Sequence, residues 1–215
     1  MIKACIFDLD GVIVDTAKYH FQAWRRLANE LGFDFSEADN EQLKGVSRME
    51  SLEIILKWGG VTLSEEQKLE WADRKNEWYK VLISNMTPDE ILPGVPEFLA
   101  QLQSHGIRIA LGSASKNALP VIESIGLGPL FEVVIDGTHT TRSKPDPQVF
   151  LLAAQRLELQ PNECIVFEDA ESGIEAALNG KFYAVGSGRP DVLGKAHLVV
   201  PGFEGLKWEE VEHIL

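Results

Sequence analysis

Three aspartates follow a short apolar run near the start of the chain, in the stretch CIFDLDGVIVDT at residues 5–16. Asp8 and Asp10 are two residues apart, so in an extended segment their side chains point to the same side. Two carboxylates placed in this way repel each other and lose hydration, and a metal ion or a shared proton offsets that cost. The alternative is a solvated strand end in which aspartate and glycine form a turn.

A second acidic pair, Glu168 and Asp169, ends another apolar run, in IVFEDAESG at residues 165–173. If the two runs form neighbouring strands, four carboxylates converge on one point. Carboxylates, carbonyls and water are the ligands that Mg²⁺ prefers. The two clusters together therefore favour a Mg²⁺ site formed by Asp8, Asp10, Glu168 and Asp169.

Two further strand ends carry groups that suit a phosphate. The stretch LGSASKN at residues 111–117 ends in Ser113, Ser115, Lys116 and Asn117. Hydroxyl and backbone donors at a helix start bind phosphate, although a plain serine N-cap is the alternative. In RSKPDP, residues 142–147, Lys144 precedes a helix that we expect to start with an Asp N-cap and a Pro at its first position. A lone lysine there is usually solvated, but near acidic pairs it can neutralise a phosphoryl group.

The elements that must position these groups alternate along the chain. Six short runs, most of them apolar throughout, are expected as strands at Ala4–Leu9, Ile107–Gly112, Val133–Ile135, Cys164–Glu168, Phe182–Gly186 and Leu198–Val200. Helical patterns lie between them, at Pro96–Ser104, Asn117–Ser124, 146–157 and Ser172–Leu178. This alternation predicts an α/β fold with a doubly wound, mostly parallel, Rossmann-like sheet.

Residues 17–87 break the alternation, because they contain helical patterns and no convincing strand. We expect helices at Lys18–Leu31, at Arg48–Trp58 and, from a capping box at Ser64–Gln67, towards Ser84. The chain then divides into an α/β domain of residues 1–16 and 88–215 and a helical insert of residues 17–87. The two chain crossings between them form a suitable pair of hinges.

Composition limits the choice of partners. The 215 residues carry a formal net charge of −13, which disfavours nucleic acid or an anionic membrane as the main partner. Cys5 and Cys164 lie in apolar runs, so we expect reduced thiols in the core, as in the cytosol. Residues 1–7 do not form a signal peptide, and no apolar run is long enough to span a bilayer. We expect a cytoplasmic monomer that acts on small molecules.

Four of these motifs occur in a characteristic order: Asp8-Leu-Asp10-Gly11, Ser113, Lys144 and Glu168-Asp169. With them the chain resembles the haloacid dehalogenase superfamily of aspartate-nucleophile phosphotransferases over nearly its whole length. The resemblance implies that the helical insert is the family's α-helical cap. It also implies that the first aspartate is the nucleophile and that the second is the general acid/base.

The resemblance further implies how the other groups act. Mg²⁺ is expected to be held by Asp8, the backbone carbonyl of Asp10 and Asp169, with Glu168 completing the site directly or through water. The serine and the lysine of the middle motifs are expected to hold the oxygens of the transferring phosphoryl group.

A closer resemblance is to the hexose-phosphate mutases of the superfamily, through the strings DGVIVDT, YHFQAW, LKGVSRMES, RKN and SASKN. It implies the interconversion of β-D-glucose 1-phosphate and D-glucose 6-phosphate through the 1,6-bisphosphate. The second phosphate needs its own cationic site, and Arg48 on the cap can bind it bidentately. The implied substrate pocket contains Thr16, His20, Trp24, Gly45, Arg48, Ser51, Lys75, Asn76, Ser115, Lys116 and Asn117. His20 is expected to orient Asp10 or a sugar hydroxyl, and Trp24 to belong either to the cap core or to the pocket wall.

Two other functions remain open. A sugar-phosphate phosphatase of the same superfamily would share the core chemistry and let water accept the phosphoryl group. A phospho-acceptor signalling module would also use a carboxylate cluster and a lysine, but it needs neither the helical insert nor Asp10 as acid/base.

Within the family pattern, a glycine that usually closes the helix after Glu168-Asp169 is replaced by Lys181. The segment GTHTTR at residues 137–142 has no assigned role, and His105, His139, His197 and His213 are expected on the surface.

Overall fold

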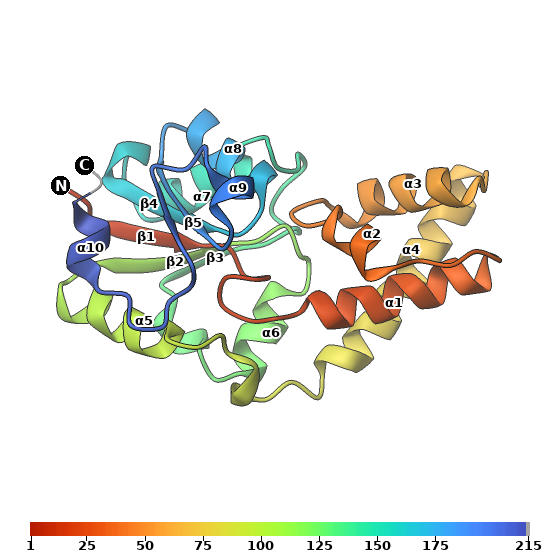
Figure 1. Cartoon of the computed structure of the whole chain (residues 1–215), viewed down its shortest axis with the longest axis horizontal. Helices are drawn as coiled ribbons and strands as arrows, with labels where there is room; N and C mark the ends of the chain where they lie inside the picture. Colours follow the sequence, from red (N-terminus) through yellow and green to blue (C-terminus); the bar gives the residue numbers. More distant parts are fainter. Residues whose placement is uncertain (214–215) are drawn as a thin grey trace.

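A parallel sheet of six strands forms the centre of the larger part of the molecule (Figure 1). The computed structural model describes residues 1–213. Its strands are β1 (Ala4–Phe7), β2 (Arg108–Gly112), β3 (Val133–Ile135), β4 (Cys164–Glu168), β5 (Tyr183–Ser187) and β6 (Leu198–Val200). They lie in the order β3-β2-β1-β4-β5-β6, and every neighbouring pair is parallel. The predicted doubly wound sheet is confirmed, and its switch point lies where the carboxyl ends of β1 and β4 meet.

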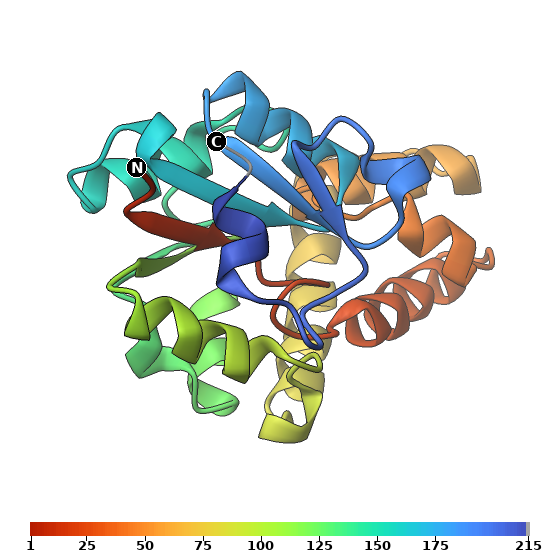
Figure 2. The same ribbon diagram turned by 60° about the vertical axis from the view of Figure 1, so that its left-hand side comes forward.

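Each face of the sheet is covered by its own layer of helices (Figure 2). Along β1, Cys5 and Phe7 point into one hydrophobic cluster, and Ala4 and Ile6 point into the other. The first cluster is completed by α5 (Val95–Ser104), α6 (Ala118–Ser124) and α10 (Trp208–Glu212). The second is completed by α7 (Gln148–Arg156), α8 (Glu171–Asn179) and α9 (Pro190–Leu193). Because both faces are buried, most strands are apolar along their whole length.

The helical insert lies beyond the carboxyl ends of the strands (Figure 1) and has a hydrophobic cluster of its own. It consists of α1 (Ala17–Glu30), α2 (Glu37–Glu41), α3 (Arg48–Gly59) and α4 (Glu65–Ile83). Trp24, Leu52 and Ile55 lie in this cluster, each 2% exposed or less. Helix α2 was not expected, although Ser36 and Asp39 form a capping box at its start that was the available signal.

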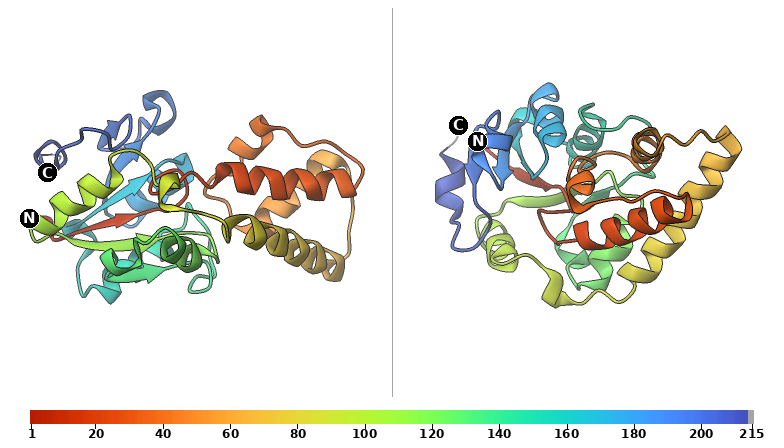
Figure 3. Two further views of the ribbon diagram at one scale, coloured as in Figure 1. Left: turned by 90° about the horizontal axis from the view of Figure 1, so that it is seen from below. Right: turned by 45° about the vertical axis from the view of Figure 1, so that its right-hand side comes forward.

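Two stretches of chain connect the insert to the sheet, as the left view of Figure 3 shows. They run side by side, because Val14 forms an antiparallel bridge with Ile91 and the Leu92 N–H donates to the Ile13 carbonyl over 2.9 Å. The second stretch contains the short 3₁₀ helix η1 (Pro88–Glu90). Glu90 of η1 accepts a hydrogen bond from the Tyr19 hydroxyl of α1. That the two crossings form a hinge stays a prediction.

Smaller expectations have mixed outcomes. Helix α7 begins at Gln148, so its N-cap is Pro147 and not the predicted Asp146. The Asp146 carboxylate instead accepts the Gln148 N–H over 3.0 Å and closes a turn just before the helix. Both thiols, Cys5 and Cys164, are buried and free. The four histidines expected on the surface are exposed.

Two 3₁₀ helices, η2 (Gly128–Leu130) and η3 (Pro161–Glu163), precede β3 and β4. Within residues 1–213, every helix is too short or too polar to cross a membrane.

The end of α8 yields a stability prediction. Lys181 has a φ of +66°, and its N–H and that of Phe182 close the helix onto the carbonyls of Leu178 and Ala177 in a Schellman motif. A lysine Cβ is strained in this left-handed conformation. We expect Lys181→Gly to raise the free energy of unfolding by about 0.5–1 kcal/mol, measured by urea denaturation. Lys181→Ala, which keeps the Cβ, should give no such gain, and a Gly variant no more stable than wild type would refute the strain.

Candidate active site

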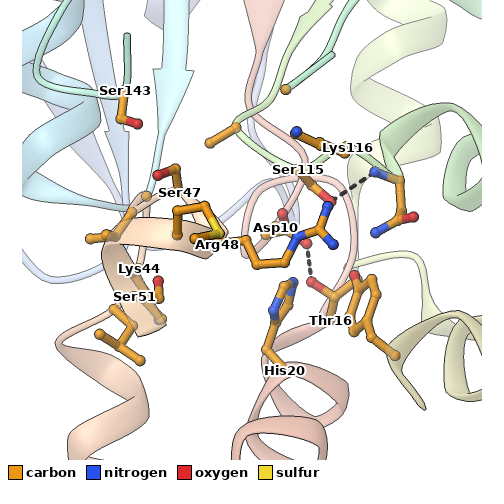
Figure 4. A pocket seen from close by; sticks show the side chains of 18 of the residues that line it. Asp10, Thr16, His20, Lys44, Ser47, Arg48, Ser51, Ser115, Lys116 and Ser143 are labelled. Carbon is orange, nitrogen blue, oxygen red and sulfur yellow. Dashed lines mark hydrogen bonds between the residues drawn. The ribbon is translucent and has the colours of Figure 1, made fainter. Parts of the chain in front are cut away.

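A cavity of about 450 Å³ lies between the carboxyl ends of the strands and the helices of the insert (Figure 4). The predicted site residues that line it are Asp8, Asp10, Thr16, His20, Trp24, Gly45, Arg48, Ser51, Lys75, Asn76, Ser115, Lys116, Asn117, Lys144 and Asp169. Ser113 and Glu168 lie behind this wall, 0% and 1% exposed. The Ser113 hydroxyl accepts the Ser115 N–H over 3.1 Å and thereby shapes the turn after β2.

Lys144 lies between two carboxylates at the switch point of the sheet. Its Nζ donates to Asp8 Oδ1 over 2.6 Å and also to Glu168 Oε1. Burial lowers the pKa of Lys144, but the two carboxylates outweigh burial and hold the pKa above its usual value. The Asp8 pKa is raised by burial, even though Lys144 opposes this. The other Asp8 oxygen accepts the Asp10 N–H over 3.0 Å, which fixes the carboxylate in place.

Asp10 has different partners from Asp8. Its carboxylate accepts a hydrogen bond from the hydroxyl of Thr16, the fully buried residue that precedes α1 (Figure 4). Burial raises the pKa of Asp10, and the Thr16 hydrogen bond acts in the opposite direction. A carboxyl group whose pKa is moved upward is better matched to proton transfer near neutral pH. The two aspartates, only two residues apart, thus differ in their partners: Asp8 is held by Lys144 and Asp10 by Thr16.

The four acidic side chains do not converge as expected. Among the described residues, no three His, Cys, Asp or Glu side chains are gathered closely enough to hold a metal ion. The reason is that each carboxylate has another partner: Lys144 for Asp8 and Glu168, Thr16 for Asp10. The fourth carboxylate, Asp169, lies 3.3 Å from the Lys44 Nζ. In this structure the four carboxylates are thus not gathered as one group of ligands, and their role in holding a metal ion stays a prediction.

A second buried lysine lies on the insert side of the cavity. Lys75 of α4 is 3% exposed, and its Nζ is 3.1 Å from His20 Nδ1 and 4.3 Å from the centroid of the Trp24 ring. Burial, together with the charge of Arg48, lowers the pKa of Lys75 to about 7. Trp24 belongs both to the hydrophobic cluster of the insert and to the cavity wall.

His20 contacts Lys75 and not Asp10, so the expectation that it orients Asp10 finds no support in its contacts. Burial, with Lys75 beside it, holds the His20 pKa well below its usual value. The imidazole is therefore neutral near pH 7. When Lys75 carries its proton, the ammonium group only donates, so Nδ1 of His20 then accepts from Lys75 and the ring proton lies on Nε2.

The buried Lys75 makes a prediction about stability. An unfolded chain has a lysine pKa near 10.4, above the folded value of about 7. Between these pH values the unfolded state therefore binds more protons than the folded state. The cost of burying Lys75 to the free energy of unfolding is largest below pH 7 and becomes smaller as the pH rises towards 10. We expect Lys75→Met to raise the free energy of unfolding by about 2–4 kcal/mol at pH 7. Urea denaturation at pH 7 and 9.5 measures this, and the gain should shrink at the higher pH.

The exposed Lys116 on the opposite wall provides a matched control. Lys116→Met removes the same charge without relieving burial, so its free energy of unfolding should stay close to the wild-type value at both pH values. If Lys75→Met instead lowered the free energy of unfolding at pH 7, the claim that the buried charge of Lys75 destabilises the fold would be contradicted.

Cationic side chains from both parts of the chain face each other across the cavity. Figure 4 shows the Arg48 guanidinium of α3 pointing towards Ser115 and Lys116 at the end of β2. Its protein contacts are long, with Nη1 3.4 Å from the Ala72 carbonyl and 3.5 Å from Asp73 Oδ1. The guanidinium is thus free to bind a ligand. The arrangement offers one cationic end near Asp8 and another at Arg48.

Three contacts join the insert to the core around the cavity. Lys44 pairs with Asp169, and Asn117 Nδ2 donates to Asn76 Oδ1 over 2.9 Å. Gly45, with a φ of +73°, approaches α8 so closely that an added Cβ would lie 2.6 Å from the Ser172 hydroxyl. Only a glycine fits this backbone conformation and this approach.

Sequence reasoning missed several cavity residues. Lys44 and Tyr79 were not singled out, although Lys44 lies beside Gly45 in the string LKGVSR and Tyr79 lies one helical turn after Lys75. The uninterpreted segment GTHTTR also contributes to the wall, through Gly137 and residues 140–142. Its sequence carried no signal, because the segment has no regular structure or known pattern.

Comparison with known proteins defines the class. The family model of the haloacid dehalogenase-like hydrolases matches residues 2–180, and the chain therefore belongs to this family. A β-phosphoglucomutase of Bacillus subtilis (strain 168) is 44% identical and aligns over 93% of this chain and 89% of its own. A crystal structure of β-phosphoglucomutase (pgmB) from Clostridium difficile, also 44% identical, superimposes with a TM-score of 0.96 over 100% of this chain and 97% of its own. A phosphorylated carbohydrates phosphatase of Thermotoga maritima is 33% identical over 100% of this chain and 98% of its own.

Proposed function

We propose that this enzyme acts as a β-phosphoglucomutase, an intramolecular phosphotransferase that interconverts β-D-glucose 1-phosphate and D-glucose 6-phosphate. The observation that carries the proposal is the pairing of two cationic ends in one cavity, Lys144 beside Asp8 and Arg48 facing Lys116. A bisphosphate needs both ends, whereas a monophosphate needs one. The 44% identity to proteins named β-phosphoglucomutase supports the same reaction.

Residues 17–87 form a mobile cap domain in this proposal, and residues 1–16 and 88–215 form the catalytic core. The separate hydrophobic cluster of the insert and its two paired crossings support this division. Cap contacts such as Asn76 with Asn117 enclose the cavity. Exclusion of water matters here, because water would otherwise take the phosphoryl group from the enzyme.

Asp8 is the nucleophile in this account. Its carboxylate is held by Lys144 on one oxygen and by the Asp10 N–H on the other. Attack on phosphorus forms a bond from the carboxylate oxygen and breaks the bond to the sugar oxygen, giving an aspartyl phosphate. Lys144 neutralises charge on the phosphoryl oxygens. Asp10, after leaving Thr16, protonates the departing sugar oxygen and later takes the proton from the incoming hydroxyl.

The carboxylates at the switch point suit a divalent cation in their chemistry, although among the described residues no three of them are gathered as one group of ligands. Asp8 and Asp169 offer hard carboxylate oxygens, and burial together with the charge of Glu168 raises the pKa of Asp169 to about 7. A raised pKa means that the charged form of this buried carboxylate is poorly stabilised, and a bound cation stabilises it. We propose that Asp8, the Asp10 carbonyl and Asp169 hold Mg²⁺, with Glu168 beside them. When bound, the ion neutralises charge on the phosphoryl group.

A comparison of anomers by ³¹P NMR tests the proposal. With Mg²⁺ and a trace of glucose 1,6-bisphosphate, the protein should convert β-glucose 1-phosphate to glucose 6-phosphate and leave the α anomer unchanged. Conversion of neither anomer would refute the proposed function.

A further inference from the structure

The hydroxyl group of Tyr79 lacks a protein partner inside the cavity wall. Tyr79 lies on α4, is 1% exposed and lines the cavity. Its hydroxyl makes no hydrogen bond to any described residue. A buried hydroxyl without a partner destabilises the folded state. A hydroxyl kept in this position is suited to a partner that arrives with the ligand.

The surroundings of Tyr79 indicate which part of a ligand it meets. Its ring packs against His20 with centroids 4.3 Å apart, and the Lys75 Nζ lies 4.8 Å from its ring centroid. The hydroxyls of Thr16 and Ser115 lie near that of Tyr79 and lower its pKa, although neither is at normal hydrogen-bond geometry, and the charge of Asp10 raises its pKa. The hydroxyl therefore lies near Thr16, the residue whose own hydroxyl donates to Asp10, and it lines the same cavity as Asp10.

The chemistry of the phenol favours a sugar hydroxyl over a phosphate or a metal ion. Burial, with the charge of Asp10, holds the Tyr79 pKa well above its usual value. The group therefore stays a neutral donor, unsuited to ligating a metal ion. The two phosphates have their own cations, Lys144 near Asp8 and Arg48 near Lys116. The part of a hexose phosphate next to Asp10 that still needs a donor is the ring and its hydroxyls.

We infer that Tyr79 donates a hydrogen bond to a hydroxyl of the bound hexose ring next to the position where Asp10 transfers its proton. This inference rests on the proposed function. It makes Tyr79 a binding residue that helps to select the sugar, in addition to the groups that hold the phosphates. It also explains why the free protein keeps a buried hydroxyl that has no partner at normal hydrogen-bond geometry.

Tyr79→Phe removes only the hydroxyl, and its effect is measured with β-glucose 1-phosphate and its 2-, 3- and 4-deoxy analogues. We expect kcat/KM for the parent substrate to fall about 5- to 10-fold, the value of one neutral hydrogen bond. With the analogue that lacks the partner hydroxyl, wild type and variant should be equal. The melting temperature of the ligand-free variant should equal or exceed that of wild type, because an unpaired hydroxyl is removed.

Tyr19→Phe is the matched control, since its hydroxyl has a partner in Glu90. That variant should melt about 2–4 °C lower, and its preference among the four sugars should match wild type. No loss with Tyr79→Phe, an equal loss on all four sugars, or a lower melting temperature would overturn the inference. Failure of the wild-type protein to convert β-glucose 1-phosphate would instead refute the proposed function.

Discussion

Asp8→Asn is expected to reduce kcat for β-glucose 1-phosphate by about 10⁴- to 10⁶-fold, the scale of losing an activated nucleophile. Asparagine has nearly the same shape but cannot attack phosphorus. The contact between Lys144 and Glu168 should persist, so the fold and the cavity stay intact. A coupled assay for glucose 6-phosphate measures kcat, and the shift in melting temperature on adding substrate shows that binding survives.

Asp15 provides the control within the same stretch of sequence. It is exposed, and its carboxylate accepts the Ala17 N–H over 3.1 Å at the start of α1. Asp15→Asn keeps an oxygen acceptor there and should leave kcat close to wild type. If Asp8→Asn retained more than a tenth of wild-type activity, the aspartyl phosphate mechanism would be excluded.

Arg48→Ala is expected to lower kcat/KM for the mutase reaction by about 10²- to 10³-fold, because one end of the bisphosphate loses its charged, hydrogen-bonded partner. Lysine restores the charge without the bidentate geometry, so Arg48→Lys should recover only part of the loss. The protein contacts of Arg48 are long, at 3.4 and 3.5 Å, and the melting temperature should therefore change little. Both variants are assayed for glucose 6-phosphate and for inorganic phosphate.

The two products of this assay separate a mutase from a phosphatase. A phosphatase acting on monophosphates tolerates the loss of a second phosphate site, so release of inorganic phosphate should survive Arg48→Ala. Undiminished formation of glucose 6-phosphate by Arg48→Ala would place the second phosphate site elsewhere.

The sheet could be predicted because its strands are buried on both faces and their apolar runs are continuous. Strand ends were less certain: β1 ends at Phe7 and not at Leu9. The residue pairing with β2 and β4 ends at Phe7, and beyond it the Asp8 N–H donates to the Phe167 carbonyl while the chain remains buried. Helix α2 escaped notice because its sequence EADNE has no apolar face. Local periodicity reveals an element only where the element buries one side.

Most of the residues predicted from motifs line the cavity, but the partners of their side chains could not be predicted. The contact of Lys144 with Asp8 joins residues far apart in the sequence, and nothing local to either predicts it. The same holds for Lys44 with Asp169, which draws that carboxylate towards the cap. The unpaired hydroxyl of Tyr79 is visible only when the packing of three segments is known.

The most direct test of the central claim is the product ratio from pure wild-type protein given β-glucose 1-phosphate, Mg²⁺ and a trace of glucose 1,6-bisphosphate. Glucose 6-phosphate and inorganic phosphate are measured in the same sample over time. We expect glucose 6-phosphate to account for nearly all the substrate consumed, with inorganic phosphate a minor product. Release of inorganic phosphate matching the substrate consumed, without glucose 6-phosphate, would contradict a mutase.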